Sequence, residues 1–345
     1  LWNICPKVPD TVPYLSAPAE LVSLWRERLS QMSGFKVGLA WQGRNLGKSG
    51  YRRSLELEHL TILLQTPGCS FVSLHPQPLQ QPHPAILDYA DKIDDFSDTA
   101  AMLANLDLVI SVDTAVAHLA GSLGVSCRVA LLHAPDWRWF PLDGQENVWY
   151  PTLQLFRQPE PGDWQSVVQQ IADSLTGDIL LKQGHELGRT GQHEAAVVLF
   201  RQATQLPDSS PAAWLNLGVY LHATGQTAAG INAIKQAVAR TPVWPEAWQN
   251  LGMLHQALRE LPEAYSCFHR ALLQRPYYPM ARWNLGLLQL LLGEYGEGFR
   301  NFEARFTKPG AVASLHTGLP RWDGTSLYGK TILVHAEQGY GDTIQ

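Results

Sequence analysis

The first half of the chain alternates short, continuously apolar runs with longer stretches whose apolar residues recur at helical spacing. The runs 36–41 (KVGLAW) and 107–112 (DLVISV) show no helical stripe, which predicts strands buried on both faces. We expect strands at 36–41, 69–74, 107–112 and 127–132, and helices at 21–32, 56–65, 97–105, 113–123 and 163–175. This alternation predicts a parallel sheet with helices on both faces, as in a Rossmann-like α/β domain.

The second half is built on a period of 34 residues, which separates Gly184, Gly218, Gly252 and Gly286. The same register holds for Trp214, Trp248, Leu217, Leu251, Leu285, Phe200, Ile234, Phe268, Phe302, Ala203, Ala237, Ala271, Pro242 and Pro276. This period and signature resemble the tetratricopeptide repeat, a helical hairpin, in four copies over 177–310.

The resemblance implies an all-α solenoid in which each hairpin buries its apolar face against its neighbours. Its glycines would let paired helices approach closely, and Trp214 and Trp248 are expected to pack in the core. The fourth copy has Arg282 in place of the tryptophan and Arg305 in place of an alanine, as in a terminal capping repeat. The first copy has Gln183 where leucine is expected. A concave peptide-binding face is possible, but no residue pattern names a ligand.

One candidate for chemistry is the turn after the strand 107–112. We expect Asp113 to cap the following helix, with the N–H groups of Thr114, Ala115 and Val116 as unpaired helix-start donors. Together with the helix dipole they would form an anion site suited to a diphosphate, with His118 one turn further on. The alternative is an ordinary aspartate cap beside a half-buried histidine.

A second candidate is the loop 42–54 (QGRNLGKSGYRRS), which contains three glycines and four cations after the first strand. Such a loop can wrap a phosphate group, with arginine supplying bidentate contacts. The candidate residues are Gly43, Arg44, Lys48, Arg52 and Arg53. The alternative is a solvated surface loop. Neither segment is a Walker loop or a GxGxxG turn, which disfavours a nucleoside triphosphatase or a dinucleotide oxidoreductase.

Composition narrows the class of protein. Hydrophobic residues make up 45% and charged residues 17%, which favours globular domains over disorder. A net charge of −5 without a long basic run argues against nucleic acid as a partner. No apolar stretch approaches the roughly 20 residues of a membrane span. The four scattered cysteines argue against a disulfide framework or zinc site, so we expect a cytoplasmic protein.

A further resemblance rests on SDTAAMLANLDLVISVDTAVAHLAGSLG (97–124). This stretch is similar to the nucleotide-sugar half of the heptosyltransferase-like glycosyltransferases (family nine), in the bacterial version joined to tetratricopeptide repeats. APDWRW (134–139), WYPTLQLFRQ (149–158) and KVGLAWQG with RRSL (52–55) fit the same group. The resemblance implies a GT-B fold, whose C-terminal half holds the sugar donor and whose N-terminal half presents the acceptor. The resemblance covers about 10–175, and residues 1–175 resemble only the C-terminal half.

The last residues, 319–345, resemble the first strand and glycine turn of the N-terminal half. Asp342 then falls on the family's catalytic base, for a second transferase unit. The expected order is a linker (1–20), a nucleotide-sugar half-domain (21–176), four repeats (177–312) and the start of a second N-terminal half (313–345). This order implies a fragment of a tandem protein that is inactive alone.

The resemblance implies metal-independent transfer of a sugar from a nucleoside diphosphate sugar to an acceptor hydroxyl. Asp113 would hold sugar hydroxyls, His118 would donate to a phosphate oxygen, and the cations of the loop 42–54 would meet the diphosphate. The repeats would recruit a protein or glycan acceptor. Two alternatives stay open: a non-catalytic repeat scaffold with a vestigial sugar-nucleotide domain, and an enzyme similar to the O-linked N-acetylglucosamine transferases, whose repeats precede the catalytic region.

Overall fold

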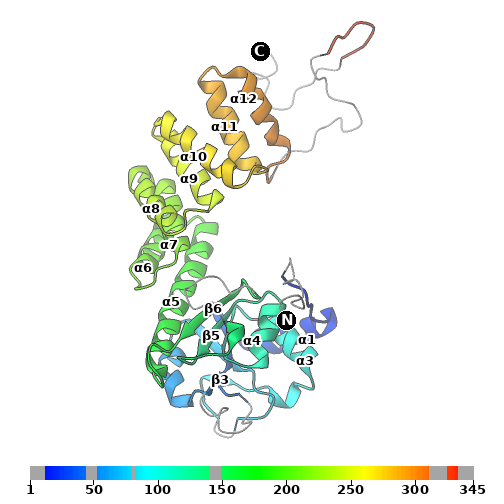
Figure 1. Ribbon diagram of the computed structural model, residues 1–345, viewed down its shortest axis with the longest axis vertical. Coiled ribbons are helices and arrows are strands. Elements are labelled where there is room, and N and C mark those ends of the chain that lie inside the picture. The colour runs from blue at the N-terminus through cyan, green and yellow to red at the C-terminus, as the bar shows by residue number, and fades with distance from the viewer. Residues whose placement is uncertain (1–11, 44–52, 80–81, 140–148, 311–324, 333–345) are drawn as a thin grey trace. The chain divides into compact units, whose positions relative to one another are not determined.

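Figure 1 shows the computed structural model of the chain, which describes residues 12–43, 53–79, 82–139, 149–310 and 325–332. The chain divides into two compact units. The first contains Leu1–Glu186 and Gln202–Ser209, and we refer to it as the α/β unit. The second contains Leu187–Arg201 and Ser210–Gln345, and we refer to it as the repeat unit.

The α/β unit is built on a six-stranded sheet in the order β3-β2-β1-β4-β5-β6, and every neighbouring pair is parallel. The strands are β1 (Phe35–Ala40), β2 (Cys69–Ser73), β3 (Ile86–Leu87), β4 (Leu108–Val112), β5 (Cys127–Leu131) and β6 (Leu153–Arg157). Central strands β4 and β5 are buried at every position, as their uninterrupted apolar runs predict. The predicted parallel sheet is confirmed and is consistent with a Rossmann-like α/β domain.

The two edge strands, β3 and β6, were not predicted from the hydrophobic pattern. β3 is only two residues long, which is too short to form a recognisable run. β6 is buried at Leu153 but partly exposed along the rest of its length, because it has a neighbour on one side only.

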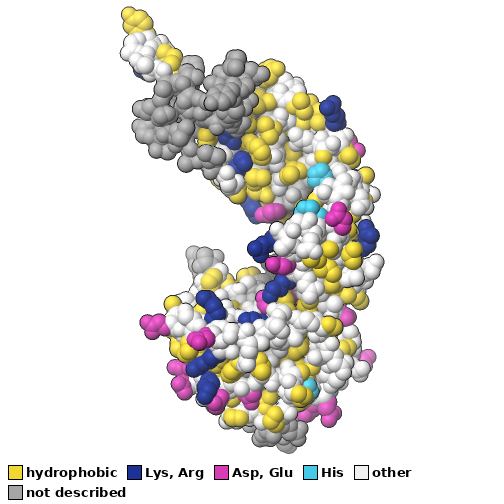
Figure 2. All heavy atoms as spheres, turned by 180° about the vertical axis from the view of Figure 1, so that it is seen from behind, with side chains coloured by type: hydrophobic (Ala, Val, Ile, Leu, Met, Phe, Trp, Pro, Cys, Tyr) yellow, Lys and Arg dark blue, Asp and Glu magenta, His cyan; other side chains and the backbone are white. Residues whose placement is uncertain are grey.

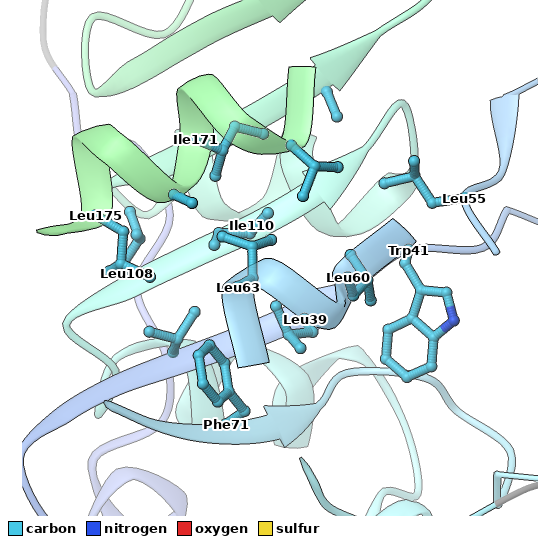
Figure 3. Close-up of a cluster of buried hydrophobic side chains, with 14 of the residues drawn as sticks. Leu39, Trp41, Leu55, Leu60, Leu63, Phe71, Leu108, Ile110, Ile171 and Leu175 are labelled. Atoms are coloured by element: carbon cyan, nitrogen blue, oxygen red, sulfur yellow. The ribbon is translucent and has the colours of Figure 1, made fainter. Parts of the chain in front are cut away.

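Helices cover both faces of the sheet, as expected. They are α1 (Ala19–Arg28), η2 (Leu29–Gln31), η4 (Leu57–Leu60), α2 (Thr61–Leu64), η5 (Ala90–Lys92), α3 (Phe96–Leu103), α4 (Ala115–Ser122), η6 (Trp137–Trp139) and α5 (Trp164–Arg189). On one face, Leu63 of α2 and Ile171 of α5 pack against strand residues such as Ile110 (Figure 3). On the other face, Trp25 of α1 and Met102 of α3 are fully buried in a second cluster.

Helix α5 continues well beyond the predicted helix 163–175, to Arg189. The domain limit expected between 176 and 177 therefore lies inside a continuous helix. Asp178 on this extension forms an ion pair with Arg128 of β5, whose side chain is only 2% exposed. Lys182, one turn later, forms an ion pair with Asp107, the residue before β4. These two ion pairs join the middle of α5 to the sheet.

The repeat unit consists of antiparallel helical hairpins, which confirms the predicted all-α solenoid of tetratricopeptide type. Its helices are α6 (His193–Thr204), α7 (Pro211–Ala223), α8 (Thr227–Arg240), α9 (Pro245–Ala257), α10 (Leu261–Gln274), α11 (Pro279–Leu291), α12 (Tyr295–Phe302) and η7 (Glu303–Phe306). A Cβ atom added to Gly218 would lie 2.4 Å from Ile234 Cγ1 and 2.7 Å from the Gly230 carbonyl oxygen. Glycine is thus required where α7 crosses α8.

Aromatic positions of the repeats pack as expected. Phe200 and Phe268 are fully buried, and Trp214 and Trp248 are partly buried against the core cluster. Trp248 Nε1 donates to the Pro242 carbonyl at 2.9 Å. One repeat later, Arg282 Nη2 donates to the Pro276 carbonyl at 2.9 Å. The arginine that replaces a tryptophan in the fourth copy therefore makes the same hydrogen bond.

Candidate nucleotide-binding site

The strand order of the α/β unit changes direction between β1 and β4, which are hydrogen-bonded neighbours. In open parallel sheets, ligands bind in the crevice outside the carboxyl ends of the strands at such a switch point. Gly43 lies shortly after β1 and Asp113 directly after β4. The two segments that the sequence singled out therefore leave the sheet from adjacent strands, at the position where a ligand is expected.

These two segments are in contact. Arg53 Nη1 lies 3.3 Å from Asp113 Oδ2, and the side chains are 36% and 9% exposed, respectively. The Gly43 N–H donates to Ser54 Oγ at 3.2 Å. A Cβ atom at Gly43 would lie 3.9 Å from Thr114 Cγ2. Residues 60 positions apart in the chain are thus brought together, and the phosphate-binding role of the loop stays a prediction.

Four other predicted site residues lie outside the described residues. They are Arg44, Lys48, Arg52 and Asp342. Their roles stay predictions.

The start of α4 differs from the expectation in one respect. The prediction that Asp113 caps this helix is wrong: Thr114 is the N-cap residue and the helix begins at Ala115. The Asp113 carboxylate binds Arg53 instead, and Thr114 Oγ1 lies 2.9 Å from Ser111 Oγ. No side chain among the described residues accepts a hydrogen bond as the cap of α4. The first-turn N–H groups of Ala115 and Val116 are therefore the helix-start donors at this site.

His118 lies one turn into α4 and is half-buried, as the sequence suggested. Its Nδ1 is 3.2 Å from the Tyr150 hydroxyl, and its ring stacks on Trp139 with centroids 4.8 Å apart. Burial lowers the pKa of His118 below its ordinary value, so the ring is neutral at pH 7. A neutral imidazole has one donor nitrogen and one acceptor nitrogen, and Tyr150 contacts one of them.

Sequence reasoning missed His75, which follows β2 at the same edge of the sheet. Its ring meets Trp41 edge-on with centroids 4.3 Å apart, and its buried Nε2 has no hydrogen-bond partner among the described residues. Burial lowers the pKa of His75 to about 4. An isolated histidine after a strand has no motif around it. Its place at the carboxyl end of β2 was the one available signal.

Metal ligation has no support within the described ranges, where no group of three His, Cys, Asp or Glu side chains is arranged to hold an ion. Three of the cysteines, Cys69, Cys127 and Cys267, are free thiols. Metal-independent chemistry stays a prediction.

On the face drawn in Figure 2, acidic and basic side chains are interspersed over the coloured surface of both units. No helix among the described residues is both long and apolar enough to cross a bilayer.

Comparison with known families identifies the repeats. The tetratricopeptide repeat family model matches residues 181–245 and 250–305. The predicted repeats are therefore confirmed over most of the repeat unit, and the matched segments begin within α5.

Individual relatives share only part of the chain. Protein FlbA of Caulobacter vibrioides is 26% identical over 181 residues, which cover 48% of this chain and 29% of FlbA. MamA, known from a crystal structure, is 22% identical to this chain. The matched region covers 39% of this chain and 81% of the MamA chain, with a TM-score of 0.36. TTC0263, a tetratricopeptide repeat protein of Thermus thermophilus, is 25% identical over 38% of this chain and 73% of its own, with a TM-score of 0.36.

Proposed function

We propose that the α/β unit binds a nucleoside diphosphate sugar at the carboxyl ends of β1 and β4. The observation that carries this proposal is the contact between Arg53 and Asp113, which joins the two candidate segments at the switch point of the sheet. A diphosphate placed there would meet the N–H groups of Ala115 and Val116 and the guanidinium of Arg53. Both are donors suited to phosphate oxygens.

The proposed reaction is sugar transfer to an acceptor hydroxyl, with this unit as the donor half of a GT-B glycosyltransferase. Departure of the diphosphate needs donors that stabilise its growing negative charge, which Arg53 and the start of α4 supply. Asp113 would accept hydrogen bonds from sugar hydroxyls. The acceptor must also lose a proton to a base, for which Asp342 of the next unit is the proposed residue. In this proposal, residues 21–176 form the donor half and 313–345 begin another acceptor half.

Isothermal titration of the full chain with UDP-, GDP- and ADP-sugars tests the binding step. We expect one nucleotide class to bind, and Arg53→Gln, Asp113→Ala and His118→Ala each to weaken it. Arg26→Gln and Asp173→Ala are matched controls, because Arg26 lies in α1 and Asp173 in α5, outside the two segments that follow β1 and β4. A folded chain that binds none of the three would contradict the proposal and favour a repeat scaffold with a vestigial domain.

We propose that the repeat unit binds a protein partner through an extended peptide segment. Asn216, Asn250 and Asn284 occupy the same position of α7, α9 and α11, 34 residues apart. Asn250 Nδ2 donates to the Glu246 carbonyl at 2.9 Å, and Asn284 Nδ2 is buried without a partner among the described residues, so a bound peptide would have to replace the first bond and uncover the second group. An asparagine side chain both donates and accepts, so it can pair with the amide groups of a peptide backbone.

Selection of random peptides on the full chain, followed by affinity measurement, tests this second proposal. Selected peptides are expected to lose affinity for Asn250→Ala and Asn284→Ala. Asn105→Ala, a change in the α/β unit, serves as the control. Peptides that bind all three variants as they bind the unaltered chain would contradict a role for these asparagines.

A further inference from the structure

The turn that follows β5 places a second arginine–aspartate pair near His118. Strand β5 runs parallel to its neighbour β4, so both strands end at the same edge of the sheet. The chain after β5 reaches η6, where the ring of Trp139 stacks on the His118 ring with centroids 4.8 Å apart. Asp136 and Arg138 belong to the same turn. This edge therefore holds a third segment, besides those after β1 and β4.

The backbone of the turn holds this pair in place. Nε of Arg138 lies 3.1 Å from Asp136 Oδ1, and the Arg138 N–H donates to the same oxygen at 3.1 Å. The Trp139 N–H donates to the Asp136 carbonyl at 3.0 Å, which links the pair to the ring that stacks on His118. The side chains of Arg138 and Asp136 are 45% and 33% exposed, so both remain open to solvent.

The charges of both residues act on the His118 ring. Burial is the main cause that lowers the pKa of His118, while the charge of Asp113 raises it, that of Arg138 lowers it and that of Asp136 raises it. Effects of this kind are screened beyond about 10 Å in a salt solution. His118 is thus near two arginine–aspartate pairs, Arg53 with Asp113 and Arg138 with Asp136.

We propose that Arg138 is a further ligand-binding residue of the nucleotide site, where it meets the second phosphate of the diphosphate. The inference rests on the proposed function and deepens it. A nucleoside diphosphate sugar carries negative charge on each phosphate, whereas Arg53 is already paired with Asp113. The start of α4 adds only about half a positive charge. A second arginine would offset the negative charge that these groups leave unbalanced.

Asp136 takes the place of the phosphate at Arg138 while no ligand is bound. The guanidinium is a planar fork of N–H donors, and Asp136 faces its Nε. Arg138 has no second ion-pair partner among the described residues, so its terminal nitrogens can pair with the oxygens of a phosphate. Because an aspartate repels a phosphate, Asp136 also opposes binding. Removing the charge of Asp136 and removing that of Arg138 should therefore have opposite effects.

Calorimetric titration of the full chain with UDP, GDP, ADP and inorganic pyrophosphate tests the inference. Arg138→Gln removes the charge and should weaken binding of the nucleoside diphosphate about tenfold. The corresponding monophosphate lacks the second phosphate and should lose no more than about twofold. Asp136→Asn keeps an oxygen that can accept from the Arg138 N–H, and should strengthen diphosphate binding about threefold. Arg26→Gln in α1 is the matched control and should leave binding unchanged.

The outcomes separate this inference from the proposed function. Unchanged affinity of Arg138→Gln for a diphosphate that the unaltered chain binds would overturn the inference alone. Weaker binding in Asp136→Asn would also overturn it, since the turn would then matter only for its structure. An equal loss for the monophosphate and the diphosphate would contradict contact with the second phosphate. A folded chain that binds no nucleotide and no pyrophosphate would overturn the inference together with the proposed function.

Discussion

The α/β unit and the repeat unit differ in how far apart in the chain their decisive contacts lie. In the repeat unit the same contact recurs every 34 residues, as in the hydrogen bonds from Trp248 and Arg282 to a proline carbonyl six residues before each. In the α/β unit, Arg53 reaches Asp113 across 60 positions and Ser122 reaches Tyr14 across 108. Periodic contacts can be predicted from sequence, whereas the long-range contacts of the α/β unit form only once the sheet has formed.

The largest loss of stability is expected from a substitution where the helices α7 and α8 of one repeat approach each other closely. Gly218→Val would place a side chain against the Gly230 carbonyl and Ile234, and should destabilise the repeat unit by about 3 kcal/mol. Gly296→Ala is the matched control, because Gly296 lies in α12 with nothing within 4 Å of an added Cβ. It should instead stabilise the chain by about 0.5–1 kcal/mol through helix propensity. Thermal unfolding followed by circular dichroism separates the two, and equal effects would contradict the role of Gly218.

Loss of a buried ion pair in the α/β unit should lower folding stability more than loss of an exposed ion pair in the repeat unit. Asp178→Ala leaves Arg128 charged and 2% exposed, at a cost of about 2–3 kcal/mol, reduced because Asp178 itself is 40% exposed. Glu246→Ala removes the partner of Arg275 at the surface of the repeat unit, and should change stability by less than about 0.5 kcal/mol. Urea unfolding measures both, and a smaller loss for Asp178→Ala than for Glu246→Ala would contradict this contrast.

The neutral state of His75 makes the stability of the α/β unit depend on pH. Burial lowers the pKa of His75 to about 4 in the folded chain, against an ordinary value of 6.5. The unfolded chain therefore binds a proton first as pH falls. The stability contributed by the neutral ring is fully present above pH 6.5 and is lost between pH 6.5 and about 4. We expect a loss of about 2–3 kcal/mol of folding free energy over this window, and no such loss in His75→Phe. If the free energy of unfolding of the unaltered chain and of His75→Phe changed with pH in the same way, this role of His75 would be contradicted.

The smallest change in stability is expected from a substitution at the turn between the two helices of a repeat. Gly191, Gly225 and Gly293 have positive φ angles at the same position of their hairpins, and Arg259 (φ 59°) holds that place in the hairpin between the last two. A side chain is strained in this conformation, so Arg259→Gly should stabilise the repeat unit by about 1 kcal/mol. Gly225→Ala, the reverse change one repeat earlier, should destabilise it by a similar amount. A neutral or destabilising Arg259→Gly in chemical denaturation would contradict the argument.

The positions of the helices and central strands could be predicted because each depends on a local hydrophobic pattern. The segments after β1 and β4 could also be chosen in advance, since glycines, cations and an acidic turn mark them. The capping of α4 was predicted wrongly, because Asp113 forms its bond with Arg53, a residue from another strand–helix connection. Tyr150 could not be predicted as a partner of His118, because nothing in its sequence neighbourhood marks a contact 32 positions away.

The central claim is that a nucleotide binds where β1 and β4 end. Backbone amide spectra of the full chain, titrated with UDP, GDP and ADP, test it most directly. We expect the largest shifts at the amides of Gly43, Ala115 and Val116, for the nucleotide whose sugar derivative binds in calorimetry. Shifts confined to the repeat unit, or the absence of shifts with all three nucleotides, would contradict it.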